Sequence, residues 1–437
     1  MEWWLVLMIL LGGVIFLMMQ GMPVAFSFLL VNLVVLYFVM GESGLHQLSL
    51  SIYDSLSKFS LSPIPLFTLM GEVLYHSGLA LRTLDVVSKF LGAIRARLTI
   101  LSIVSGAIFA ALSGSTIANT AMLGSLMLPE MRRRGYAKPM TIGPLMASGS
   151  LAMLIPPSAL TVLLGSLASI SIGKLLIGGI VPGIMIATMY VAYVLIRCWI
   201  NPKLAPVYEV SSASSSEKLV ALVKDAVPVG GIVFLVTGLI FLGVATPTEA
   251  ASLGAMGAII LARIYGKLDF EVLKKSVKGT LIVTVMTFMI LAGSGAFSQL
   301  MAYTGATRGL VATAVALPLA PIMIFISMQA VVLVLGAFIE QVSIMMITLP
   351  IFMPLVTTFG FDPVWFGIIM LVNLELAMLS PPFGMLLFVM KGVAPPDITM
   401  GDIYKSALPF VLLDLAAMAI LITFPPIATW LPYLVKA

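Results

Sequence analysis

Long apolar runs separated by short polar segments follow one another along almost the whole chain. A helix needs about 20 apolar residues to cross the ~30 Å hydrocarbon core of a bilayer. Runs of this length occur in both halves, so we predict an all-α polytopic membrane protein. The expected single spans are Trp3–Met19, Met22–Met40, Leu61–Ala80 and Ile172–Ile196, then Val227–Val244, Ala250–Ile264, Leu281–Thr304 and Leu408–Thr429.

One run in each half has a length that fits neither one crossing nor two. Leu98–Pro129 carries the polar stretch Ser113–Thr116 near its middle. Because its two arms are each too short to cross the bilayer, we predict a re-entrant hairpin with this stretch at its tip. Ile322–Pro354 predicts a second hairpin, whose polar tip contains Glu340.

Each predicted hairpin is followed by an apolar run that a proline pair interrupts. Pro156-Pro157 lies within Pro139–Ser169, and Pro381-Pro382 lies within Val364–Met390. Proline removes a backbone donor and clashes with the preceding helical turn. We therefore predict two discontinuous helices; the alternative is a simple kink in a tilted helix.

The two halves are related by an internal repeat. The segment Leu151–Pro157 (LAMLIPP) matches Leu376–Pro382 (LAMLSPP) at an offset of 376 − 151 = 225 residues, and Pro129 falls on Pro354 at the same offset. Three spans, a hairpin, a broken span and a last span give an odd number of crossings per half, which predicts inverted repeats. The expected units are scaffold spans at 1–80 and 227–304, transport units at 81–204 and 305–437, and a cytoplasmic linker at 205–226.

Basic residues are concentrated in loops that this arrangement places on one side. The loops on the other side, 41–60, 305–321 and 355–363, are poor in lysine and arginine. The positive-inside rule makes the basic side cytoplasmic. Both termini are therefore expected on the opposite, periplasmic side of an inner membrane. The basic positions are Arg82, Lys89, Arg95, Arg97, Arg132, Arg133, Arg134, Lys138, Arg263, Lys267, Lys274, Lys275 and Lys278.

Composition agrees with this class. Hydrophobic residues make up 61% of the 437 residues and charged residues only 9%, and the mean hydropathy is +1.16. Soluble domains carry roughly 25% charged residues, so aqueous enzymes and nucleic-acid binders are disfavoured despite a net charge of +5. One cysteine and two histidines cannot form a disulfide or a histidine-rich metal site. No GxxxxGK[ST] motif is present, so an ion gradient or a partner must supply energy.

Polar residues at the predicted tips and breaks are the candidate site. Non-helical backbone at membrane depth is tolerated only where it lines a cavity or binds something. Hydroxyl and carbonyl oxygens there can coordinate sodium, and half-helix N-termini favour an anionic substrate. At the first tip, close helix packing by small residues is the alternative explanation. The first-tip candidates are Ser113, Ser115, Thr116, Asn119 and Thr120.

The second tip offers Gly336, Glu340, Gln341 and Ser343 as the equivalent group. A carboxylate inside a membrane is costly, which favours a functional role for Glu340, unless it lies at a tip exposed to water. Asn373 and Glu375, just before the second break, are further buried polar candidates.

These motifs resemble the large membrane subunit of TRAP (tripartite ATP-independent periplasmic) transporters, the DctM-like family. The resemblance covers nearly the whole chain in order. Asn119 stands where the family often has aspartate, and Glu375 where it often has glycine. The motifs are Leu112–Thr120, Ile155–Ser158, Gly336–Glu340, and Asn373 to Pro382 followed by Gly384 and Leu387–Val389.

The resemblance implies an elevator-type, sodium-driven importer of an organic acid, carboxylate or sialic-acid-like, with no cofactor. It also implies two partners, a small four-span membrane subunit and a periplasmic substrate-binding protein, in a bacterial or archaeal inner membrane. The sodium positions implied are Ser113, Ser115, Asn119, Gly149, Ser150, Pro156, Gly336, Glu340, Gln341, Ser380 and Pro381. The substrate positions expected are Thr116, Pro157, Ser158, Ser343, Asn373, Glu375 and Pro382.

Two other functions remain open at this point. A stand-alone sodium/anion symporter of the wider ion-transporter group would have the same fold and would need no binding protein. A membrane enzyme or a channel is the alternative from another class, although no convergent acid, base or metal set is visible in the sequence.

Overall fold

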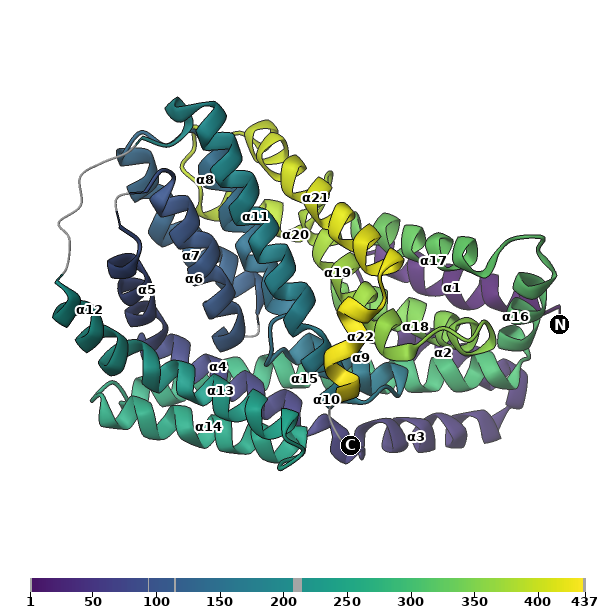
Figure 1. Cartoon of the computed structure of the whole chain (residues 1–437). Helices are drawn as coiled ribbons and strands as arrows, with labels where there is room; N and C mark the ends of the chain where they lie inside the picture. Colours follow the sequence, from purple (N-terminus) through teal and green to yellow (C-terminus); the bar gives the residue numbers. More distant parts are fainter. Residues whose placement is uncertain (1, 93, 114, 207–213, 435–437) are drawn as a thin grey trace.

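The computed structural model describes residues 2–92, 94–113, 115–206 and 214–434, which form helices joined by short turns and contain no β-strand (Figure 1). The predicted all-α class is confirmed. The first-half helices are α1 (Trp3–Met19), α2 (Val24–Met40), α3 (Glu42–Leu56), η1 (Phe59–Leu61), α4 (Pro63–His76), α5 (Leu79–Phe90), α6 (Arg97–Ser113), α7 (Thr116–Arg133), α8 (Lys138–Ser150), η2 (Leu151–Met153), α9 (Ala159–Ala168), α10 (Ile172–Gly178), α11 (Ile180–Ile200) and η3 (Pro202–Leu204).

The second half repeats much of this order. Within the described residues, five helices are long and apolar enough to cross a membrane, or six if the bent pair α4–α5 is one span. The second-half helices are α12 (Ser215–Ala221), η4 (Leu222–Ala226), α13 (Val227–Phe241), α14 (Pro247–Ile264), α15 (Phe270–Tyr303), α16 (Ala306–Ala316), α17 (Pro321–Gly336), α18 (Gln341–Thr358), α19 (Pro363–Leu379), α20 (Met385–Val393), α21 (Met400–Thr423) and α22 (Pro426–Leu434).

Helix starts recur at the repeat offset found in the sequence. Helices α7 and α18 begin at 116 and 341, and α8 and α19 begin at 138 and 363, which are separations of 225 residues in both cases. Each hairpin is a helix–turn–helix pair, α6–α7 or α17–α18, and each proline pair lies between two helices that it separates. The order hairpin, interrupted helix, long helix therefore occurs twice.

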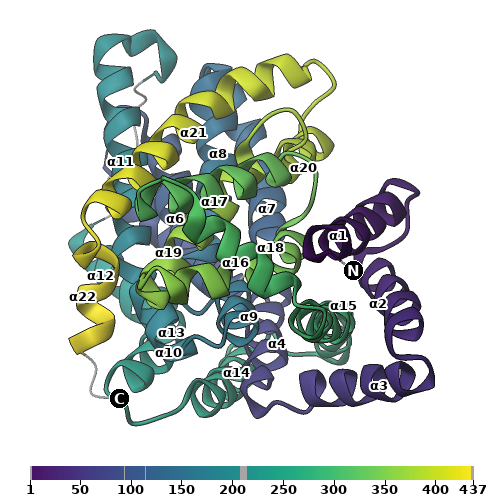
Figure 2. The ribbon, with the colours of Figure 1, turned by 90° about the vertical axis from the view of Figure 1, so that its right-hand side faces the viewer.

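Helix α15 packs against α2, α3 and α4 and lies at the centre of one group of helices. We call this group, which consists of α1–α4 and α13–α15, the α15 group. Figure 2 shows α2 and α3 beyond α15 on one side, with α9 and α18 on the other. Glycines allow the close approach: a Cβ on Gly293 would lie 2.8 Å from the Cβ of Phe28, and one on Gly295 would lie 3.0 Å from that of Ser55. Small residues let membrane helices pack closely in this way.

Helix α19 is the centre of the other group, the α19 group: α6–α11 and α17–α22. Every residue of α19 from Val364 to Leu379 is buried. It packs against α17, α21, α10 and α8, and α8 is itself buried from Met140 to Ser150. The two groups meet where α4 packs on α6 and α9, and α15 packs on α18.

Several segments expected as loops are helices. Residues 41–60 contain α3, the loop after Ala80 contains α5, and 305–321 contains α16. These helices are too short or too amphipathic to register as apolar runs; α3 buries Gly44, Leu48, Ser51 and Ser55, which lie on one helical face.

Two other boundaries differ from those expected. Helix α15 begins at Phe270 rather than near Leu281, because Asp269 caps it: Asp269 Oδ1 accepts a hydrogen bond from Val272 N at 2.7 Å. The linker 205–226 is helical from Ser215 onward, where Ser214 and Glu217 form a capping box. Positions 207–213 lie outside the described residues.

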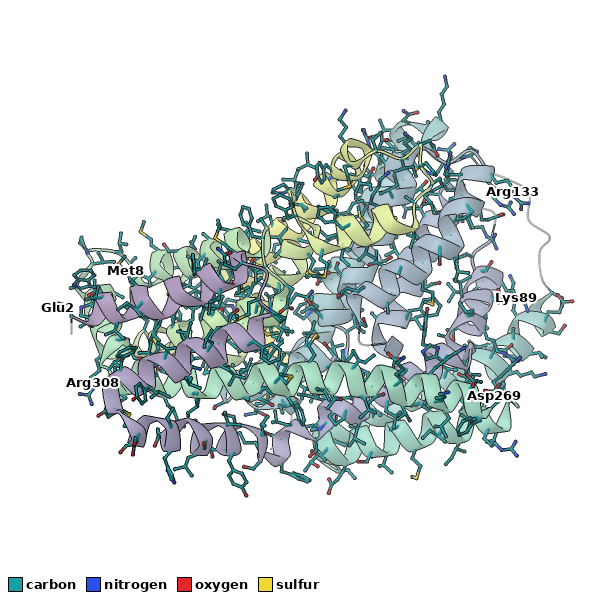
Figure 3. All side chains as sticks on the ribbon, turned by 180° about the vertical axis from the view of Figure 1, so that it is seen from behind. Glu2, Met8, Lys89, Arg133, Asp269 and Arg308 are labelled. Atoms are coloured by element: carbon teal, nitrogen blue, oxygen red, sulfur yellow. The ribbon has the colours of Figure 1, made fainter. Side chains whose placement is uncertain are left out.

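The grouping of the loops agrees with the charge pattern in the sequence. Figure 3 shows Lys89, Arg133 and Asp269 at one end of the molecule, and Glu2 and Arg308 at the other. The basic loops that flank the first hairpin and the loop before α15 therefore share one end, as predicted. Ion pairs there join the two halves: Arg132 with Asp397 and Lys138 with Asp402, each at 2.8 Å.

Candidate functional site

A large cavity lies between the two helix groups. Its volume is about 960 Å³, and it is lined on one side by α2, α4 and α15 and on the other by both hairpin tips and the first helix break. The lining from the tips and breaks consists of Ser115, Thr116, Ile117, Pro157, Ala159, Leu160, Leu163, Glu340, Gln341, Val342 and Met385.

Four helices begin at this cavity. Thr116, Ala159, Gln341 and Met385 are the first residues of α7, α9, α18 and α20, and each lines the cavity wall. The first turn of a helix has backbone N–H groups without helical partners and carries the positive end of the helix dipole. The wall formed by the α19 group therefore favours a negatively charged group in the cavity.

The first tip is built around the cap of α7. The Ser115 side chain accepts a hydrogen bond from Ala118 N at 3.3 Å, and the buried Thr116 beside it also lines the cavity. Asn119 donates from Nδ2 to the Gly106 carbonyl at 3.0 Å, while its Oδ1 and the hydroxyl of Thr120 are buried without a hydrogen-bond partner. These two oxygens are available to a cation. Ser113 ends α6, and Gly114 and the side chain of Ser113 lie outside the described residues.

The second tip uses a carboxylate in the same place. Glu340 caps α18: its oxygens accept hydrogen bonds from Val342 N and Ser343 N, both at 2.8 Å, and from the Ser343 hydroxyl. Glu340 and Ser115 are equivalent positions of the repeat, since they precede the helices that begin at 341 and 116. Both tips therefore place an oxygen-bearing cap against the cavity, and only the second carries a charge.

A glycine allows each hairpin to pack closely against its interrupted helix. A Cβ on Gly149 would lie 1.9 Å from Oγ1 of Thr120, and one on Gly336 would lie 2.1 Å from the Cβ of Ala377. Real side chains do not approach this closely, so both positions need glycine. Gly149 and Gly336 are thus packing residues of the tips, whatever ligand the tips bind.

Gly149→Ala is expected to lower the free energy of unfolding by about 1–3 kcal/mol, because the added methyl group must displace Thr120 or the backbone. The melting temperature of the purified protein checks this. Gly231→Ala is the matched control, since Gly231 lies within α13 with nothing near its missing Cβ. It should be neutral or slightly stabilising. Equal melting temperatures for the two variants would contradict the packing role.

The structure brings some of the sequence-predicted residues to the cavity and leaves others elsewhere. Ser115, Thr116, Pro157, Glu340 and Gln341 line it. Ser158 caps α9 at its edge by accepting from Thr161 N at 3.3 Å, and Ser343 reaches it only through Glu340. The remaining described positions, which are not part of its lining, are Asn119, Gly149, Ser150, Pro156, Gly336, Asn373, Glu375, Ser380, Pro381 and Pro382.

Asn373 and the second proline pair have structural partners instead. Asn373 donates from Nδ2 to the backbone carbonyl of Gln329 at 2.7 Å and to its side-chain oxygen at 2.9 Å, which ties α19 to the second hairpin. Pro381 and Pro382 are exposed, and the Pro382 carbonyl accepts from the Tyr404 hydroxyl at 2.8 Å. Ser380 donates to the Leu376 carbonyl at 2.8 Å.

Sequence reasoning missed several polar residues that the fold places in important positions. Glu72 and Thr68 of α4 line the opposite wall of the cavity, and Glu72 pairs with His76 at 3.1 Å. Asp414 is fully buried in α21. Both acids stand inside runs predicted to cross the membrane, so the rule that singled out Glu340 would also have found them.

The arrangement is suited to binding a small ion and an anion in one cavity. Oxygen atoms at two tips can hold a hard cation, and helix N-termini beside them can hold an anion. Among the described residues, no group of three or more His, Cys, Asp and Glu side chains could hold a metal ion. Fold and site together define a multi-pass helical membrane transporter.

Comparison with known proteins identifies the family. The family model for the DctM component of the tripartite ATP-independent periplasmic transporters matches residues 11–427. The chain belongs to this family and is a large permease component of a TRAP transporter.

Its relatives are permease proteins with different named substrates. The chain is 30% identical to the C4-dicarboxylate TRAP transporter large permease protein of Rhodobacter capsulatus, over 98% of this chain and 99% of that one. It is 31% identical to the isethionate TRAP transporter permease protein DctMQ of Oleidesulfovibrio alaskensis, over 96% of this chain and 65% of that one. The YdaH transporter of Alcanivorax borkumensis shares the fold, with a TM-score of 0.64 at 14% identity, covering 90% of each chain.

Proposed function

We propose that this permease couples the inward movement of sodium to the uptake of a small organic acid across the inner membrane of a bacterium or archaeon. The observation that carries the proposal is that two repeat-related tips, Ser115 and Glu340, and four helix N-termini face one cavity. Oxygens of the tips would bind sodium, and the N-termini would bind the negatively charged acid group of the substrate. Two relatives are named for C4-dicarboxylate and isethionate, which supports a small organic anion.

The partners proposed are those of the family: a small four-span membrane subunit and a periplasmic protein that delivers the substrate. The cavity lies at the boundary between the α15 group and the α19 group. We propose that the repeats are inverted in the membrane and that the α19 group moves as a unit against the α15 group. A substrate held at the tips would then change sides without the tips facing lipid.

Reconstitution tests this function directly. Proteoliposomes that contain the permease and its membrane partner should accumulate labelled organic acid when sodium is higher outside and the binding protein is supplied. A potassium gradient of equal size should give no accumulation. Uptake that is equally fast without the binding protein would instead favour a stand-alone symporter. Uptake that is equally fast without a sodium gradient would overturn the sodium coupling.

A further inference from the structure

Four buried polar side chains meet inside the α19 group, apart from the residues that line the cavity. The Oγ of Ser150, the last residue of α8, lies 2.8 Å from Glu375 Oε1 of α19 and 2.8 Å from the Ala147 carbonyl, and its one hydrogen is shared between these two acceptors. Tyr190 of α11 donates from its hydroxyl to Asp414 Oδ1 of α21 at 2.5 Å. All four have 0% exposure. Ser150 and Glu375 are equivalent positions of the two repeats, 225 residues apart.

Each carboxylate keeps one oxygen without a partner. Glu375 Oε2 and Asp414 Oδ2 are buried, and neither has a hydrogen-bond partner. The helices that carry these side chains pack against one another: α19 contacts α21 and α8, and α11 contacts α21 and α8. The four side chains therefore form one cluster with two unpaired oxygens, one from each acid.

No basic side chain compensates this cluster within the described part of the chain. The ion pairs found there involve Glu72, Glu130, Asp225, Asp397 and Asp402, and none involves Glu375 or Asp414. An uncompensated buried charge costs several kcal/mol, and like charges at one buried site add to that cost. A bound monovalent cation offsets one of the two charges, and a proton on the second acid offsets the other.

We propose that Glu375 and Asp414, with Ser150 and Tyr190, bind one sodium ion inside the α19 group, separate from the tips. One ion between the acids would give both unpaired oxygens a partner at once. Both hydroxyl groups donate their hydrogen and keep lone pairs, so they can act as additional oxygen ligands. Oxygen is the ligand atom that hard cations prefer. One sodium ion balances one negative charge, so one of the two acids would keep its proton while the other is ionised.

The position of this ion gives it a role different from that of tip sodium. Its ligands come from α8 and α11 of the first half and from α19 and α21 of the second half. The ion would therefore hold the two halves of the α19 group together, so that they move as one body. This role does not depend on whether sodium at the tips drives uptake.

Sodium-dependent stability of the full-length permease in lipid nanodiscs tests the site without a transport assay. The melting temperature is measured while sodium replaces choline at constant pH and ionic strength, and bound radioactive sodium is counted per chain. The variants are Asp414→Asn, Glu375→Gln and Tyr190→Phe. Glu42→Gln on the exposed face of α3 is the control.

Asp414→Asn and Glu375→Gln should each lose one bound sodium per chain, or bind it about tenfold or more weakly. Their melting temperature without sodium should equal or exceed that of the unmodified protein, because a buried charge has been removed. When sodium is added, the melting temperature of both variants should rise less than that of the unmodified protein. Tyr190→Phe should weaken sodium binding less, and Glu42→Gln should keep the sodium count of the unmodified protein.

Two outcomes would overturn the proposal. One is an unchanged sodium count in Asp414→Asn and Glu375→Gln; loss of a protonated-carboxyl infrared band in the same variants would then identify a proton as the occupant. The other is an equal fall in melting temperature with and without sodium, which would show a purely structural cluster. Because neither readout requires uptake, failure here is distinguishable from failure of the proposed transport.

Discussion

Glu340→Asn should raise the sodium concentration needed for half-maximal uptake about 5- to 150-fold, the equivalent of losing a ligand interaction of about 1–3 kcal/mol. Asparagine is among the best helix N-caps, so it can replace Glu340 in accepting from Val342 N and Ser343 N. The substitution therefore removes the charge at the second tip and keeps the start of α18. Sodium titrations of uptake in proteoliposomes measure the effect.

Two companion variants separate charge from capping. Glu340→Asp keeps the negative charge and the cap of α18. Its half-maximal uptake should need little more sodium than that of the unmodified protein. Glu340→Ala removes both, and should also lower the melting temperature by weakening the cap. If Glu340→Asn leaves the sodium requirement unchanged while Glu340→Ala raises it, Glu340 serves only as a cap, and sodium is not bound through its charge.

A disulfide between the two helix groups should abolish uptake, and reduction should restore it. Gly173 of α10 and Ile240 of α13 offer a suitable pair: a Cβ on Gly173 would lie 3.4 Å from Cγ2 of Ile240. Because Cγ2 is bonded to the Cβ of Ile240, the two Cβ atoms are at most about 5 Å apart, close to the roughly 3.5–4.5 Å of a disulfide. Gly173→Cys with Ile240→Cys is therefore the pair chosen to bridge α10 to α13. The background is Cys198→Ala, which removes the one native cysteine. The bridge lies away from the tips, so it blocks movement rather than the site.

A disulfide within the α19 group is the matched control. A Cβ on Gly183 would lie 3.5 Å from the Cβ of Leu154, which joins α11 to the first break. Gly183→Cys with Leu154→Cys should leave uptake largely unchanged in both redox states if this group moves as one body. Full uptake with the first bridge closed, or loss of uptake with only the second closed, would replace the moving-unit account by local gating.

The sequence predicted the parts of the fold that follow from local properties of the chain. Proline pairs at 156–157 and 381–382 must interrupt helices, and the structure has breaks at both. The polar stretch around Ser115 and the carboxylate of Glu340 are costly in lipid, and the structure turns both toward one cavity. Span length and proline chemistry are local properties, so they can be predicted without knowledge of the packing.

The unpredicted features depend on three-dimensional packing. Helices α3, α5 and α16 are amphipathic or short, and only their neighbours make them stable. Glu375 was expected at the substrate, but which face of α19 meets the cavity is set by the helices around it. The hydrogen-bonded pairs Ser150–Glu375 and Tyr190–Asp414 join residues that are 225 and 224 positions apart in the sequence. No spacing rule brings these four residues together.

The central claim is that residues from both repeats form one binding site, and protection of single cysteines tests it most directly. Ile117→Cys on the first tip and Met385→Cys at the start of α20 both line the cavity, whereas Leu242→Cys lies on the exposed surface at the end of α13. In a Cys198→Ala background, sodium with substrate at about ten times its Kd should slow maleimide labelling of both cavity positions about tenfold. Leu242→Cys should label at an unchanged rate. Protection of Ile117→Cys without protection of Met385→Cys, or the reverse, would contradict a single shared site.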